Sequence, residues 1–138
     1  MEVSHLLTRI EMHRGPCVLT TNLRQQLDAA FLRRFHVVAE FSRPSAEARA
    51  ALWNLHVPRR APRDTAIDVD RLGEALVLSG GQIRNAALRA AVLASAQDQS
   101  IGLKHLACAV WSELAKEGRE LSPSMLGFLA NELPERYA

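Results

Sequence analysis

The sequence has few aromatic residues, few cysteines and no long apolar run, and each shortage excludes something. Aromatic residues make up 5% of the 138 residues and apolar residues 48%, so any core must be aliphatic. Cys17 and Cys108 form no CxxC pair. This favours buried thiols in a reducing compartment over a disulfide or a metal site. No run approaches about 18 apolar residues, and no charged leader precedes an apolar stretch. We therefore expect a soluble, cytoplasmic protein without a membrane partner.

Net charge is also small. The 17 lysines and arginines nearly balance the 15 acidic residues, giving +2 with the signs interspersed. Charge of this kind does not indicate a nucleic-acid partner. The densest basic stretch, residues 59–63, is broken by proline and is interpreted as a solvated loop rather than a phosphate-binding patch. The five histidines are scattered without an evident carboxylate or nucleophile, so Ser/His/Asp catalysis has no support.

The chain is long enough for about one domain, but its composition changes near Pro44. Before Pro44, apolar spacing predicts a helix over residues 3–14 that Gly15 and Pro16 end. Residues 17–21 and 36–41 are predicted to be buried parallel strands. A short helix over residues 27–34 is predicted to connect them.

From Ser45 onward the sequence predicts helices alone. Ser45 and Asp68 are expected N-caps, and the pair Ser122-Pro123 is expected to begin the last helix. Gly80 and Gly81 are interpreted as a break before a long, central helix over residues 82–97. The apolar positions expected to face the core recur at helical spacing. They are Ala48, Ala51, Leu52, Leu55, Val69, Leu72, Leu76, Val77, Ile83, Ala87, Leu88, Ala91, Ala94, Leu103, Leu106, Ala107, Val110, Trp111 and Leu114.

Four polar residues are candidates for handling a terminal phosphate, and three of them precede Pro44. Asn22 follows the first predicted strand, and ligands bind α/β sheets at the carboxyl ends of strands. Its amide can orient a water or touch a γ-phosphate; alternatively, it is a turn residue. Arg33 and Arg34 lie at the end of the short helix, and an arginine can stabilise charge on a transferred phosphoryl group. Alternatively, they satisfy the helix dipole and its terminal carbonyls.

Arg84 is the candidate in the second half of the chain. It is predicted to lie in the first turn of its helix, after Gly80 and Gly81, which allow the backbone close to a ligand. A cation at a helix N-terminus is mildly unfavourable, which favours a functional role over that of an ordinary exposed arginine.

These segments resemble AAA+ ATPases, and the resemblance spans nearly the whole chain. Residues 2–11 resemble the helix that follows the acidic Mg²⁺-binding strand, and residues 18–22 are similar to the sensor-1 strand. The stretch 27–35, Leu-Asp-Ala-Ala-Phe-Leu-Arg-Arg-Phe, resembles the arginine-finger segment, and residues 79–91 resemble the sensor-2 helix of the lid. The nearest relatives that we can suggest are the bacterial ATPases that accompany contractile injection systems.

The resemblance implies a fold class and a domain division. It implies an α/β remnant of a AAA+ P-loop core over residues 1–43 and an all-α helical lid over residues 44–138, helical overall. In that family the strand carrying the phosphate loop lies between the two strands kept here. Residues 17–21 and 36–41 would then leave open sheet edges, whereas the lid is expected to fold alone.

The resemblance also implies a division of labour. The sequence contains no Gly-x-x-x-x-Gly-Lys-[Ser/Thr] and no apolar strand ending in paired carboxylates. ATP and Mg²⁺ are therefore expected in the complete protein, with neither bound to this chain alone. The chain is interpreted as a truncated product or as one piece of a split ATPase. The implied partners are other AAA+ subunits in a homo-oligomeric ring, a hexamer, and a remodelled protein substrate. The alternative is a non-enzymatic helical interaction or regulatory module.

Overall fold

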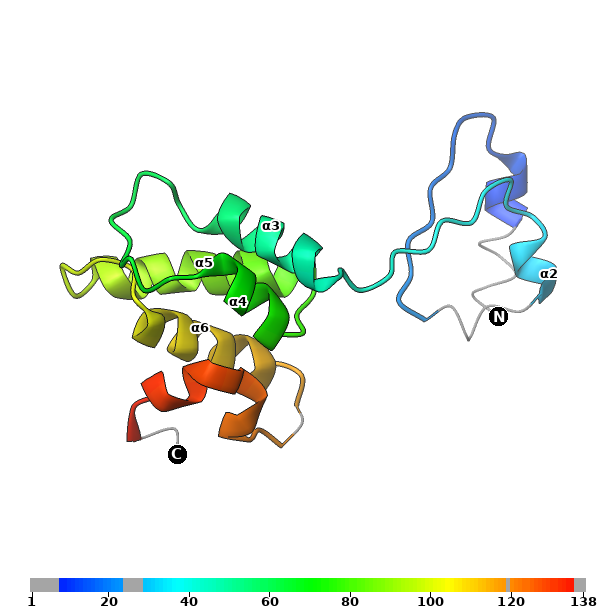
Figure 1. The fold of residues 1–138 in the computed structure, drawn as a ribbon. Coiled ribbons are helices and arrows are strands. Elements are labelled where there is room, and N and C mark those ends of the chain that lie inside the picture. Colours follow the sequence, from blue (N-terminus) through cyan, green and yellow to red (C-terminus); the bar gives the residue numbers. More distant parts are fainter. Residues whose placement is uncertain (1–7, 24–28, 119, 136–138) are drawn as a thin grey trace. The chain divides into compact units, whose positions relative to one another are not determined.

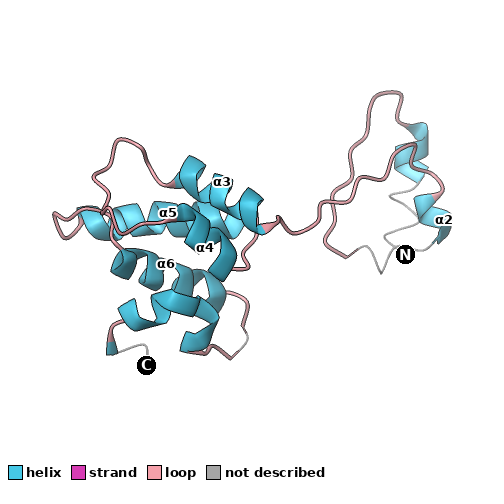
Figure 2. Ribbon diagram, viewed as in Figure 1, coloured by secondary structure: helices cyan, strands magenta, loops and turns pink. Residues whose placement is uncertain are grey.

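The computed structural model describes residues 8–23, 29–118 and 120–135, and these are predominantly helical (Figures 1 and 2). The chain divides into two compact units, Met1–Phe41 and Ser42–Ala138. No helix within the described ranges is both long and apolar enough to cross a membrane.

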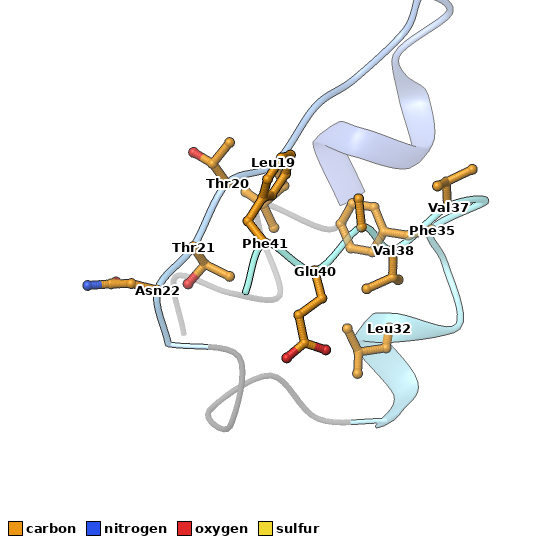
Figure 3. A pocket seen from close by; sticks show the side chains of 11 residues that line it. Leu19, Thr20, Thr21, Asn22, Leu32, Phe35, Val37, Val38, Glu40 and Phe41 are labelled. Carbon is orange, nitrogen blue, oxygen red and sulfur yellow. The ribbon is translucent and has the colours of Figure 1, made fainter. Parts of the chain in front are cut away.

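The first unit contains short helical segments joined by extended chain. Residues 8–12 are helical, and α2 spans Ala29–Leu32. The two predicted strands are wrong, because residues 17–21 and 36–41 form no ladder and appear as loop (Figure 2). A parallel strand is stabilised by hydrogen bonds to its neighbours, and no partner strand is present in the described part of this unit. Side chains from both segments instead border a common hollow (Figure 3).

The second unit is a helical bundle, as the sequence predicted. Its elements are α3 (Ala46–His56), α4 (Val69–Ala75), α5 (Gly80–Ser95), α6 (Leu103–Ala115) and η2 (Pro123–Glu132). Helix α3 packs against α4 and α5, while α6 packs against α5 and η2. In the described residues, the one β-type pairing is an isolated parallel bridge between Arg63 and Ile101, which joins two loops.

Both predicted N-caps are confirmed. The Ser45 hydroxyl accepts a hydrogen bond from the Ala48 amide at 3.2 Å. The Asp68 carboxylate accepts from the amides of Asp70 and Arg71 at 3.0 and 3.2 Å. Each cap satisfies an amide that the first helical turn leaves without an intrahelical partner.

Two helix predictions need correction. Helix α5 begins at Gly80 rather than Gln82, because Ser79 and the side chain of Gln82 form a reciprocal capping box that includes both glycines in the first turn. The last helix begins at Pro123 as predicted, but it is a 3₁₀ helix interrupted at Gly127. Gly127 has φ 55°, which breaks a regular helix and favours glycine.

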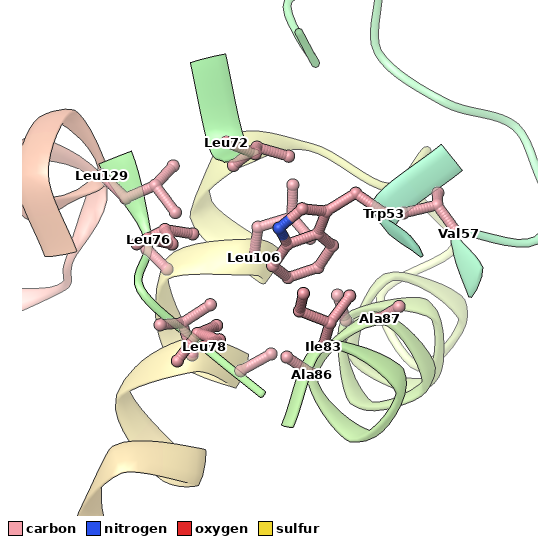
Figure 4. Packing of buried hydrophobic residues seen from close by; sticks show 14 of the residues in the cluster. Trp53, Val57, Leu72, Leu76, Leu78, Ile83, Ala86, Ala87, Leu106 and Leu129 are labelled. Atoms are coloured by element: carbon pink, nitrogen blue, oxygen red, sulfur yellow. The ribbon is translucent and has the colours of Figure 1, made fainter. Parts of the chain in front are cut away.

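Trp53 lies at the centre of the core of the second unit. Its side chain is fully buried among residues of α4, α5 and α6, including Leu72, Ile83 and Leu106 (Figure 4). The predicted apolar stripe of α3 is therefore rotated: Leu55 is 66% exposed, and Arg49, Ala50 and Trp53 face inward. Burial of the largest apolar side chain decides which face of the helix turns inward.

Helices α3 and α4 approach closely at Gly73. A Cβ atom at this position would lie 2.5 Å from the Ala46 carbonyl oxygen and 2.8 Å from the Ala50 amide nitrogen. Buried Arg49 reinforces the contact, since its Nε donates to the Gly73 carbonyl at 2.8 Å and its Nη1 donates to the Pro44 carbonyl at 2.7 Å. The guanidinium thus ties α4 to the chain that enters α3, and its burial is compensated by two acceptors.

Candidate functional site

The first unit contains a hollow of about 380 Å³ that Asn22 borders. Its wall is largely apolar, with Leu32 and Phe35 on the α2 side and Leu19 across from them. The Glu40 side chain extends between these walls, whereas the Asn22 amide points away from Leu32 and Glu40 (Figure 3). The amide therefore faces solvent and can reach a ligand outside the hollow rather than one inside it. Glu40 was not among the predicted site residues, although a carboxylate within the apolar run 36–41 is a signal for one.

Asn22 lies at a bend rather than at the end of a strand. The hydroxyl of the preceding Thr21 accepts a hydrogen bond from the Leu23 amide at 2.9 Å, which stabilises the turn. Asn22 thus lies in a bend, in agreement with the alternative that it is a turn residue. Its exposed side-chain amide points outward (Figure 3).

Arg33 and Arg34 lie in a turn directly after α2, which ends at Leu32 rather than at Arg34 as predicted. The surroundings of the two arginines differ. The Arg34 guanidinium forms an exposed ion pair with Glu11 of the 8–12 helix. The Arg33 side chain is exposed and makes no hydrogen bond or ion pair within the described part of the chain. An exposed ion pair contributes little stability, about 0–1 kcal/mol, but it does orient Arg34 toward its own unit.

Arg84 lies in the second turn of α5, not in the first as predicted, because the helix starts at Gly80. Its side chain is exposed. The two glycines are helical, and a Cβ at Gly81 would meet nothing within 4 Å. Open space around Gly81 leaves the start of α5 accessible, whereas a Cβ at Gly80 would make an ordinary contact with Leu52 at 3.6 Å.

The predicted site residues are divided between the two units. Asn22, Arg33 and Arg34 belong to the first, where the residues on either side of the two arginines, Leu32 and Phe35, border the same hollow as Asn22. Arg84, Gly80 and Gly81 belong to the second unit. Within the first unit, then, the structure brings the Asn22 segment and the end of α2 together.

Polar contacts between α5 and α6 fix the start of α5. The side-chain Nε2 of Gln82 donates to Glu117, just after α6, at 2.7 Å. The side-chain Nδ2 of Asn85 donates to the buried Glu113 of α6 at 3.4 Å. Lys116 forms an ion pair with the same Glu113 carboxylate. Asn85 therefore connects α5 to α6 through its side chain.

A second hollow, of about 250 Å³, lies beside α5 and α6 in the second unit, and we call it the basic hollow. Its lining residues are Arg89, Leu93, Gln97, Lys104, His105, Cys108, Ser112 and Pro134. Cys108 is half-buried here, while Cys17 is exposed, so the prediction of a buried thiol is wrong for Cys17. Cys17 lies in the extended segment for which no sheet forms.

His105 has a defined hydrogen-bonding state in this hollow. The residue is 2% exposed, and its Nδ1 accepts from the Gly102 backbone amide at 3.0 Å. In a neutral imidazole the proton then lies on Nε2, which is 3.3 Å from the side-chain oxygen Oε1 of Gln97. Desolvation by burial, with a smaller contribution from the Lys104 charge, lowers the pKa of His105 below 6.5.

Comparison with known proteins assigns no family. No protein-family model matches the chain, and no curated protein is significantly similar to it. The AAA+ resemblance therefore rests on the residues described above.

Proposed function

We propose that this chain is the C-terminal portion of an AAA+ ATPase, which contributes sensor and arginine-finger residues to a nucleotide site completed by another polypeptide segment. The observation that carries the proposal is the contrast between the two arginines after α2. Arg34 is paired with Glu11, whereas Arg33 projects from the end of the helix without a partner in the described residues. A finger must reach another subunit's nucleotide, which requires an exposed and uncommitted guanidinium.

In this proposal Arg33 is the finger and Arg34 supports the turn. Phosphoryl transfer places charge on the equatorial oxygens of the transferred group, and a guanidinium inserted there stabilises that charge. Asn22, whose amide faces outward, orients the attacking water or contacts the γ-phosphate.

The helical bundle acts as the lid of the same site. Arg84 extends from α5, whose start is fixed by the Ser79 cap and by the contacts of Gln82 and Asn85 with α6. A contact between Arg84 and the γ-phosphate would transmit force to the whole bundle rather than to a single side chain. In the proposed assembly ATP and Mg²⁺ are gripped by the completing segment, and the subunits form a ring.

Two measurements test this function. The 138-residue chain alone, titrated with MgATP in a calorimeter, is expected to show no binding tighter than about 1 mM. The chain is next joined to a phosphate-loop segment from the reading frame upstream of Met1, and the joined protein is allowed to assemble into a ring. Arg33→Ala should then lower ATP turnover by about 10³ or more while ATP affinity is unchanged.

Arg34→Ala is the matched comparison, because it removes the same charge one residue away. It should lower turnover less than Arg33→Ala, since its guanidinium is oriented toward Glu11. Tight ATP binding and hydrolysis by the isolated chain would refute the proposal. Full ATP turnover in Arg33→Ala would refute the assignment of Arg33 as the finger, but not the proposal that the chain is the C-terminal portion of an AAA+ ATPase.

A second candidate function is a non-enzymatic interaction module. Leu88 and Val92 lie one turn apart on α5 and are each 60% exposed, although Leu88 was predicted to face the core. Exposed apolar residues on one helix face are typical of protein-binding surfaces. Two results would favour this function. The first is an upstream reading frame that encodes no phosphate loop. The second is a partner protein whose binding is lost in Leu88→Ser but retained in Arg33→Ala.

A further inference from the structure

The basic hollow beside α5 and α6 has no role in the proposed function, yet its lining has the character of a binding site. Two permanent cations border it, Arg89 from α5 and Lys104 from α6. No carboxylate belongs to the described residues that line it. Its volume of about 250 Å³ is slightly below that of typical drug-sized pockets, so it suits a small ligand.

The hollow is unsuited to a metal ion despite the presence of His105 and Cys108. Two fixed positive charges repel a second cation, and in the described part of the chain no group of three or more His, Cys, Asp or Glu side chains is placed to hold a metal. Because Nδ1 of His105 accepts from the Gly102 amide, this nitrogen is also occupied.

Three neutral polar side chains in the hollow can donate hydrogen bonds. His105 presents its Nε2–H, satisfied by a long contact of 3.3 Å with Gln97. Ser112 adds a hydroxyl, and the Gln97 amide carries two further donors. An anion with several oxygens would take the place of the weak Gln97 acceptor and gain charge-assisted hydrogen bonds from both cations.

From this arrangement we infer that the basic hollow binds a small tetrahedral oxyanion of the phosphate class, held by Arg89, Lys104 and the Nε2–H of His105. The two cations come from different helices, so the bound anion bridges α5 and α6. The site is distinct from Arg33 and Arg84, and its occupancy is independent of whether the chain belongs to an ATPase.

The test is a titration of the ¹⁵N-labelled full chain with inorganic phosphate, followed by NMR in a buffer of neutral pH and constant ionic strength. Saturable shifts are expected for amides around residues 89–97 and 104–112. Lys104→Gln and Arg89→Gln should each weaken binding by about tenfold. Arg60→Gln is the control, because it removes an exposed charge from the 58–65 loop and should change affinity by less than about twofold.

Three results would overturn the inference: shifts that never saturate, acetate binding as tightly as phosphate, or an effect of Arg60→Gln equal to that of Lys104→Gln. Arg89 and Lys104 are exposed, so circular dichroism should show that their variants remain folded.

The two free thiols provide an independent readout on the same molecule. Cys108 borders the hollow, and Cys17 is an exposed cysteine in the other unit. Phosphate at a saturating concentration should slow the alkylation of Cys108 by iodoacetamide in proportion to occupancy, while alkylation of Cys17 stays constant. Equal slowing of both thiols, or of neither, would contradict an anion in the hollow.

Discussion

Replacing Gly73 with alanine tests the closest helix contact in the bundle. The added Cβ would lie 2.5 Å from the Ala46 carbonyl oxygen, 2.8 Å from the Ala50 amide nitrogen and 2.9 Å from the Ala50 Cβ. Two of these neighbours are backbone atoms of α3, which no side-chain rotation can move. Helices α3 and α4 must therefore separate, and the Arg49 hydrogen bond to the Gly73 carbonyl must lengthen.

The expected cost follows from opposing contributions. Overpacking a close contact costs about 1–3 kcal/mol, and alanine recovers about 1 kcal/mol of helix propensity relative to glycine. Weakening the Arg49 hydrogen bond adds to the cost, because bonds from charged donors contribute about 1.5–3 kcal/mol when intact. We expect a net loss of about 2 kcal/mol. For a domain of this size that corresponds to about 10 °C in melting temperature.

Gly81→Ala provides the matched control. Gly81 is also helical, but its Cβ would meet nothing within 4 Å, so the same substitution should stabilise by about 0.5–1 kcal/mol. Urea unfolding followed by tryptophan fluorescence measures both variants, since Trp53 and Trp111 lie in the second unit. The reasoning fails if Gly73→Ala is as stable as the parent chain, or if Gly81→Ala loses more stability than Gly73→Ala.

Two further predictions concern the same bundle. The pKa of His105 is lowered in the folded chain. Below about pH 6.5 the unfolded chain therefore takes up a proton that the folded chain does not. The free energy of unfolding should then fall with decreasing pH until the folded-state pKa is reached. His105→Gln should flatten this part of the profile, measured by urea unfolding in buffers without phosphate; an unchanged slope would contradict it. Ser79→Ala removes the hydroxyl that caps the Gln82 backbone amide and should lower the free energy of unfolding by about 1 kcal/mol. Ser95→Ala, at the exposed C-terminal end of the same helix, is the control and should lower it by less than about 0.5 kcal/mol. Equal losses of stability in the two variants would refute the role of the cap.

The helical half was predictable because its signals are local. Ser45 and Asp68 cap the helices that follow them, and a cap depends on atoms two or three residues away. The start of α5 was misplaced by two residues because the glycines were interpreted as a break, although Ser79 and Gln82 already had the spacing of a capping box.

Features that depend on distant partners were predicted poorly. Residues 17–21 have a strand-like composition, but composition does not supply the neighbouring strand that a ladder requires. The buried face of α3 was assigned from alanines and leucines, whereas Trp53 and the two acceptors of Arg49 determine it. Those acceptors, the Gly73 and Pro44 carbonyls, are invisible to any periodicity along α3.

Contacts within the fold distinguish structural arginines from candidate functional ones. Arg49 is buried against two carbonyls, and Arg71 lies 4.0 Å from the centre of the Phe128 ring, so packing explains both. Arg34 has Glu11 as its partner. Arg33 and Arg84 are exposed, and nothing in the described residues accounts for their charge. Since a solvated arginine contributes little to stability, alanine at either position should leave the unfolding midpoint nearly unchanged. Any loss of ATP turnover in those variants would then reflect the nucleotide site and not the fold.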